Sequence, residues 1–166
     1  MTRTDLPPAR DERTQLATFL DYTRATALAK CEGVSQENAV RSPLPGSPLM
    51  TLAGIVNHLR WVEYYWFEVV FLGGEDEGPW TDEDPDREMR IAVDMPLAEV
   101  LRGYEEQSAR YRELVASHEL DALAARERHG RHPDLRWIVL HLIEETARHN
   151  GHIDIIRETL DGTTGY

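Results

Sequence analysis

Three polar side chains interrupt an apolar helical pattern near the end of the chain. From Leu135 to Leu160, apolar residues recur every three or four positions, which is the spacing of one face of an α-helix. Glu145, His149 and His152 occupy positions in that same row. Because Glu145 and His149 stand four residues apart, one helix face presents a carboxylate and an imidazole that could bind one metal ion. We expect all three side chains to point into the protein.

A matching interruption occurs earlier in the chain. Residues 51–72 also follow helical spacing, and His58 stands in the apolar row that runs from Ile55 to Tyr65. Two imidazoles and one carboxylate, completed by water, form an open catalytic ligand set for zinc, and nickel, iron and manganese also accept such ligands. The spacing therefore predicts that His58 and the later pair bind one divalent ion, with zinc as the leading candidate.

Two further side chains are candidates for catalysis. His152 either replaces Glu145 as a metal ligand, supports a ligand through a hydrogen bond, or contacts substrate, and we favour the last two roles. Tyr65 shares the row of His58, so it is the aromatic residue best placed to act on a substrate. Its aromatic neighbours within residues 61–67 either line a pocket or pack in the core.

Arg148 is the candidate for binding a cofactor or co-substrate. It either pairs with Glu144 or Glu145, or it holds an anionic group of a ligand. The other histidines receive no role. His141 lies beside the polar row and is expected to be partly exposed, and three histidines in polar connections are expected to be solvated, namely His118, His129 and His132.

Composition limits the possible partners. The chain has 166 residues, which fits one domain over residues 1–166. Its formal charge of −12 argues against nucleic acid and anionic membranes as partners. The sequence contains neither an apolar run of about 20 residues nor a secretory signal. Cys31, the single cysteine, falls in an apolar run and predicts a buried free thiol in a reducing compartment. We expect a soluble cytoplasmic protein.

The elements that position these residues are predicted to be helices. The first helix should bury Phe19, Leu20 and Cys31, and Thr51 should cap the second. The sequence has no strand-like alternation of useful length. Long amphipathic helices predict an all-α four-helix bundle; their expected ranges are residues 10–32, 51–72, 96–117 and 134–161.

The connections between these helices differ in composition. Residues 33–48 are rich in proline and glycine and are expected to form a loop. Residues 75–94 are acidic and turn-rich, and we expect a flexible excursion or lid that is too polar to pack. Residues 118–132 form another polar connection, with a short helical turn expected over residues 121–128.

Two segments resemble a known family. The specific one is HLIEETARHNGHIDIIRE at residues 141–158, and it is paired with NHLRWVEYYWF at residues 57–67. Together they are similar to the DinB-like superfamily, in particular its branch of actinomycete mini-circle proteins and mycothiol-dependent S-transferases. The resemblance covers most of the chain. It implies an up-down-down-up bundle, often dimeric, in which three side chains hold a divalent metal. Its ligand positions fall on His58, Glu145 and His149, although many relatives have a histidine where this chain has Glu145.

The resemblance also implies a function. Such relatives conjugate or isomerise small electrophiles with mycothiol or a similar thiol, so the expected partners are a small electrophile and a low-molecular-weight thiol, with a possible homodimer. A divalent metal suits this chemistry because it stabilises the thiolate. Two alternatives stay open. One is a metal-dependent hydrolase in which water attacks. The other is a non-enzymatic metal-binding module for stress response or interaction.

Overall fold

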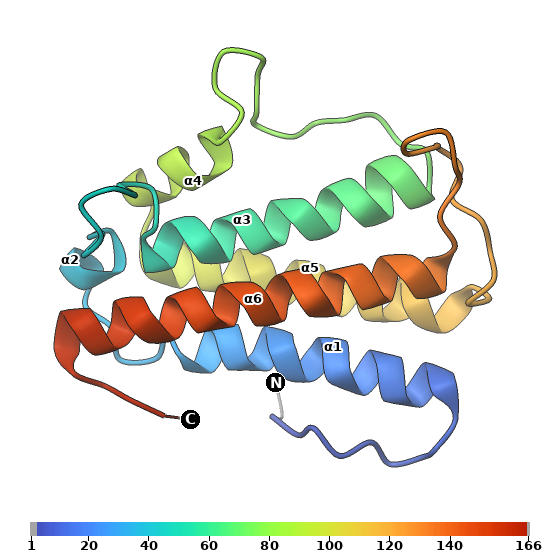
Figure 1. Ribbon diagram of the computed structural model, residues 1–166, viewed down its shortest axis with the longest axis horizontal. Helices are drawn as coiled ribbons and strands as arrows, with labels where there is room; N and C mark the ends of the chain where they lie inside the picture. Colours follow the sequence, from blue (N-terminus) through green and yellow to red (C-terminus); the bar gives the residue numbers. More distant parts are fainter. Residues whose placement is uncertain (1–2, 166) are drawn as a thin grey trace.

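The computed structural model describes residues 3–165, and its regular elements are helical (Figure 1). Residues 1, 2 and 166, the ends of the predicted domain, lie outside the described residues. Within residues 3–165 the β-structure consists of isolated bridges, so the predicted all-α class is confirmed. The elements are α1 (Glu12–Ala29), α2 (Gln36–Ala39), α3 (Leu52–Tyr64), the π-helix η1 (Tyr65–Phe71), α4 (Arg87–Ile91), the 3₁₀-helix η2 (Ala92–Asp94), α5 (Leu97–Ser117) and α6 (Leu135–Asp161).

Four long helices form the bundle. Figure 1 shows α1 and α6 running in one direction and α3 and α5 running in the other, which confirms the predicted up-down-down-up course. α6 packs against both α1 and α3, while α5 packs against α3 and α1. The two helices that carry the polar interruptions, α3 and α6, are therefore direct neighbours.

Local sequence signals fix where these helices begin and end. The Thr51 hydroxyl accepts a hydrogen bond from the Gly54 amide at 2.9 Å, as predicted for the start of α3. The Asp134 carboxylate accepts one from the Trp137 amide at 2.8 Å and caps α6. Gly162 ends α6 with φ of 76°, a left-handed conformation that glycine adopts without steric cost. These caps set the register of both helices.

The core contains a buried ion pair that sequence analysis did not anticipate. The Arg24 guanidinium of α1 donates to both carboxylate oxygens of Glu63 on α3, at 2.8 and 2.7 Å, and both side chains are 1% exposed. The Tyr104 hydroxyl of α5 donates to the same carboxylate at 3.2 Å. The charged pair therefore links three helices through hydrogen bonds that satisfy its buried polar atoms.

Several expectations about the helices need correction. Phe19, expected in the core, is 46% exposed because α1 turns that position outward, whereas Leu20 and Cys31 are buried as predicted. The second helix does not continue as an α-helix to residue 72, because its last turns widen into η1. The 33–48 segment is not wholly a loop, since it contains α2.

The third connection also differs from expectation. No helical turn forms over residues 121–128. Instead, antiparallel bridges join Leu123 to Asp134 and Arg128 to Arg131. The backbone groups in this segment pair across the connection, as in the hydrogen bond from the Arg128 amide to the Arg131 carbonyl at 2.7 Å. Residues that face each other in this way cannot also form helical hydrogen bonds.

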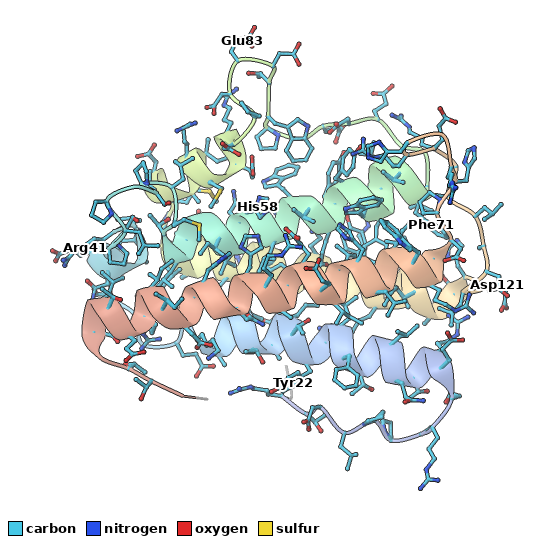
Figure 2. The ribbon with its side chains drawn as sticks, in the orientation of Figure 1. Tyr22, Arg41, His58, Phe71, Glu83 and Asp121 are labelled. Carbon is cyan, nitrogen blue, oxygen red and sulfur yellow. The ribbon has the colours of Figure 1, made fainter. Side chains whose placement is uncertain are left out.

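The acidic 75–94 segment was expected to be too polar to pack, and this is wrong for its second half. Residues Arg87–Ile91 form α4, which packs on α3 and buries Glu88 and Met89. Gly54 permits this approach, because a Cβ atom there would lie 3.3 Å from the Met89 carbonyl oxygen. The Asn57 side chain donates to the Glu88 carbonyl oxygen at 2.6 Å. Much of the first half is exposed, with Glu83 at its outer tip in Figure 2, although Trp80 packs against Trp61 and Tyr65.

None of the helices within residues 3–165 is both long enough and apolar enough to cross a lipid bilayer.

The Arg24–Glu63 pair gives a stability prediction. Arg24→Met leaves the Glu63 carboxylate buried without its cation, so we expect the free energy of unfolding to fall by about 3–5 kcal/mol. Urea denaturation followed by circular dichroism measures this loss. Arg90→Met is the control, because Arg90 pairs with Asp84 at 2.9 Å but is 49% exposed, and its loss should stay below about 1 kcal/mol. Equal losses in the two variants would contradict the role assigned to the buried pair.

Candidate metal centre

Side chains from α3 and α6 meet in a small cluster. The His58 Nε2 atom lies 3.6 Å from the Glu145 Oε1 atom, and the His149 Nε2 atom lies 3.2 Å from the same oxygen. The ligand atoms of all three side chains lie within 4.8 Å of one another. Figure 2 marks His58 partway along α3. The fold thus brings together the three residues that the sequence pattern selected.

The separations between these atoms fit a small divalent ion. Ligand atoms about 2.0–2.1 Å from a tetrahedral zinc ion lie about 3.3–3.4 Å from one another. The two observed separations from the Glu145 oxygen, 3.2 and 3.6 Å, bracket that value. Three protein ligands would leave a fourth position for water or a substrate atom. The donor set therefore fits an open site for zinc or a similar metal.

His58 is oriented by a residue from α4. Its Nδ1 atom lies 2.8 Å from the Glu88 Oε1 atom. An ionised carboxylate only accepts hydrogen bonds, so the Nδ1 atom carries the proton and donates it. In the neutral ring this would leave the Nε2 lone pair free for a metal ion, whereas in the metal-free protein the protonated Nε2 atom donates to Glu145. A carboxylate behind a ligating histidine is a common arrangement in metal sites, since it fixes the tautomer and makes the ring a stronger ligand.

His149 has a comparable neighbour in His152. Their Nδ1 atoms are 3.3 Å apart, and the two rings meet edge to face. Burial and the charge of nearby His149 and Arg148 lower the pKa of His152, so its ring stays neutral. A neutral His152 can accept a hydrogen bond from the His149 Nδ1 atom, which would leave the His149 Nε2 lone pair free for a metal ion when one is bound. This geometry favours the supporting role of His152 over its use as a ligand.

The electrostatics of the cluster centre on Glu145. Hydrogen bonds from His149 and His58 hold the pKa of Glu145 well below its usual range. Burial alone would lower the pKa of His58, but hydrogen bonds to the Glu145 and Glu88 carboxylates outweigh it and raise that pKa to about 9. Without a metal ion, a proton on His58 thus holds the two carboxylates close.

Arg148 contacts carboxylates of its own helix. Its guanidinium pairs with Glu144 and lies 3.0 Å from the Glu145 Oε2 atom. Of the alternatives left open by the sequence, pairing with both acids is the one the structure contains. Its charge therefore acts on the outer oxygen of Glu145.

The polar row of α6 lies at the edge of the core. Glu145 and His149 are each 12% exposed at the side chain, while their neighbours Thr146 and Asn150 are buried. Glu145 and His149 are therefore mostly buried, in line with the expectation that the row points into the protein, and each keeps a small exposed area. A row at the edge keeps the three polar groups accessible to solvent and ligands.

A cavity of about 260 Å³ adjoins His58, and we name it the His58 cavity. The widened turns of η1 place Tyr65 and Trp66 in its wall, and Glu88 and Trp80 complete it. Phe67, by contrast, is buried in the core. π-Helical turns are frequent at functional sites, because they change the direction in which side chains point. Residues 61–67 therefore contribute both to the wall of a cavity and to the core, which are the two roles that the sequence left open.

Cys31 lies outside this cluster. It is a free, buried thiol, and burial raises its pKa to about 12. A thiol with such a pKa is a poor nucleophile at neutral pH. Any reactive sulfur at the candidate centre must therefore come from a second molecule.

One known protein family covers most of the chain. The family model for mycothiol S-transferases matches residues 15–162. The chain belongs to the mycothiol S-transferase family. The matched range includes α3, α4 and α6, so it contains every residue of the candidate centre. No curated protein matched the chain.

The sequence of this S-transferase family member did not identify Glu88 as a residue of the site. The residue lies in an acidic, turn-rich segment, where one carboxylate resembles its neighbours. Met89 follows Glu88 directly. An apolar residue inside an acidic segment was the available signal that residues 87–91 pack against the rest of the protein. Only the position of α4 on α3 identifies Glu88 as the partner of His58.

Glu88 gives a prediction about metal affinity. Glu88→Ala removes the acceptor of the His58 Nδ1 proton, so we expect zinc to bind about 10–100-fold more weakly. Glu88→Gln keeps a carbonyl acceptor and should lose less. Competition with a chromogenic chelator measures the zinc dissociation constants of both variants. Glu83→Gln, at the exposed tip of the same segment, should bind zinc like the unmodified protein; unchanged affinity in Glu88→Ala would contradict the positioning role.

Cys31 gives a second prediction. Because the thiol is buried and its pKa is raised, iodoacetamide at pH 8 should alkylate the folded protein slower than the urea-unfolded chain by roughly two to three orders of magnitude. Mass spectrometry follows the reaction. A cysteine introduced at the exposed helix surface, Ala116→Cys, should react at the rate of the unfolded chain. Rapid labelling of Cys31 in the folded protein would show that the sulfur is accessible.

Proposed function

We propose that this protein is a divalent-metal-dependent S-transferase that joins the sulfur of mycothiol to a small electrophile. The observation that carries the proposal is the cluster of His58, Glu145 and His149, which lies within a chain of the mycothiol S-transferase family. A cytoplasmic location and a homodimer stay predictions.

His58, Glu145 and His149 would hold the metal. A divalent ion with this ligand set, zinc being the leading candidate, would lower the pKa of a thiol at its open position, so that the sulfur is anionic at neutral pH. Glu88 and His152 keep the Nε2 atoms of the two ligating histidines directed at the site. Arg148 would hold the outer oxygen of Glu145 through its 3.0 Å contact.

In the proposed reaction, the thiol sulfur forms a bond to an electrophilic carbon and the leaving group departs with its electron pair. The thiol proton must be accepted before or during this step. In neutral His152 the Nδ1 atom accepts a hydrogen bond from His149 at 3.3 Å, so the Nε2 atom carries the hydrogen of the ring and can donate it to a substrate, while the thiol proton would pass to solvent water. Tyr65 lines the His58 cavity, where its hydroxyl can orient the electrophile.

The central test is loss of metal and activity together. His149→Ala removes one ligand, so we expect bound metal to fall from about one ion per chain to near zero, with thiol conjugation reduced by at least about 100-fold. Elemental analysis and mycothiol consumption with a generic electrophile measure the two quantities. The control is His118→Gln, which changes the histidine that follows α5 and should alter neither the bound metal nor the thiol conjugation.

Three results would overturn the proposal. Turnover of the electrophile without any thiol would indicate a hydrolase, in which water takes the open position. Full conjugation activity in His149→Ala would exclude this cluster as the centre. A protein without metal and without turnover would favour the interaction-module alternative.

A further inference from the structure

A second and larger cavity of about 630 Å³ lies beyond the metal cluster, and we name it the Arg128 cavity. Trp66, Trp137 and His141 line one part of it, and the 118–134 connection supplies Arg128 and Arg131. The volume is that of a site for a small molecule. Neither the metal cluster nor its supporting residues use this space.

The cavity concentrates positive charge in an acidic protein. Besides the two guanidinium groups, it is lined by imidazoles, and the one acidic residue in its lining is Asp134. The Asp134 carboxylate already accepts the Trp137 amide at the start of α6. Within residues 3–165, neither Arg128 nor Arg131 forms an ion pair with a carboxylate. The cavity therefore has two cations without an anionic partner, although the chain carries a net charge of −12.

A tight turn holds these two arginines opposite each other. Arg128 and Arg131 are antiparallel bridge partners, with backbone hydrogen bonds of 2.7 and 3.1 Å between them. The turn residues His129 and Gly130 have φ of 53° and 76°. Positive φ at both central residues is the geometry of a two-residue hairpin turn, and it is unfavourable for His129. The side chains of Arg128 and Arg131 therefore start from paired positions at the cavity, where an anion could contact both guanidiniums.

The aromatic part of the cavity favours a flat ligand. The His141 ring stacks on Trp137, with 5.2 Å between centroids and 9° between planes. Trp66 meets both rings edge-on or tilted, at 4.8 and 5.2 Å. The Arg128 guanidinium lies over the Tyr65 and Trp66 rings, at 5.3 and 6.0 Å. Trp137 is 48% exposed, so a flat apolar group can still stack on it.

The cavity adjoins the candidate metal centre. Trp66 lines both the Arg128 cavity and the His58 cavity. His141 precedes Glu145 by one helical turn, which corresponds to about 6 Å along α6. A ligand in the Arg128 cavity could therefore lie close to the metal cluster.

We propose that the Arg128 cavity binds the carboxylate of a planar acid, with Arg128 and Arg131 holding the carboxylate and Trp137 stacking on its flat body. In the S-transferase, this acid is the electrophile, so its role in turnover rests on the proposed function. The binding itself does not depend on the metal or on the thiol.

The test measures binding of trans-cinnamate and of its uncharged analogue cinnamamide by isothermal titration calorimetry. The unmodified protein should bind the acid at least about tenfold more tightly than the amide. The double variant Arg128→Gln/Arg131→Gln should lose that difference. The control Arg41→Gln/Arg102→Gln removes two exposed charges elsewhere, and Figure 2 shows Arg41 at the opposite end of the bundle from Asp121.

Several outcomes would overturn the assignment. Equal affinity for acid and amide in the unmodified protein would contradict it, and so would a double variant that still prefers the acid. His149→Ala should keep the preference; its loss there would mean that the carboxylate binds the metal instead.

Kinetics separate this inference from the proposed function. With thiol present, the double variant should raise the KM for an acidic electrophile by at least about tenfold, and it should leave the KM for a neutral one unchanged. Preferential binding of cinnamate without any thiol transfer would refute the proposed function and keep the binding site. Normal thiol transfer, with KM changed equally for the acidic and the neutral electrophile, would refute the acid-binding site and keep the proposed function.

Discussion

The contact between α3 and α6 brings two imidazoles and a carboxylate into one small volume, and much of the structure keeps that contact in place. A carboxylate withdrawn from water is unfavourable unless it is paired. Glu145 is paired on both sides, by His58 at 3.6 Å and by His149 at 3.2 Å. The buried Arg24–Glu63 pair holds α1 against α3. The backbone positions of the two ligand-bearing helices are thus fixed by the core before any metal binds.

Around this contact, each ligating group has a partner of its own. Glu88 contacts His58, His152 contacts His149, and Arg148 contacts Glu145. These partners come from different places, since Glu88 reaches the site from α4 while the other two share α6. Supporting groups of this kind fix which nitrogen of each histidine is free. The site is therefore organised by hydrogen bonds that exist without the metal.

The aromatic segment after α3 connects this site to its surroundings. In the π-helical turns Tyr65 and Trp66 lie at the edge of the core and line cavities, while Phe67 is buried in it. Trp66 then forms a wall between two cavities, one beside His58 and one lined by the arginines of the 118–134 connection. The same short segment thus contributes to core packing, to the candidate catalytic cavity and to the proposed acid-binding cavity.

The sequence by itself determined the all-α bundle and the trio of His58, Glu145 and His149. Helical periodicity reports which residues share a face, and polar residues on an apolar face indicate groups that need partners. It did not determine the π-helical turns, the outward position of Phe19, or the packing of α4 with Glu88. Nor did it place Arg128 and Arg131 opposite each other or give His129 and His132 their place in a cavity. Those features depend on contacts between segments far apart in the chain, and periodicity within one segment carries no information about them. Only the tertiary structure decides which loop carboxylate meets His58, because that choice depends on where α4 packs and not on its composition.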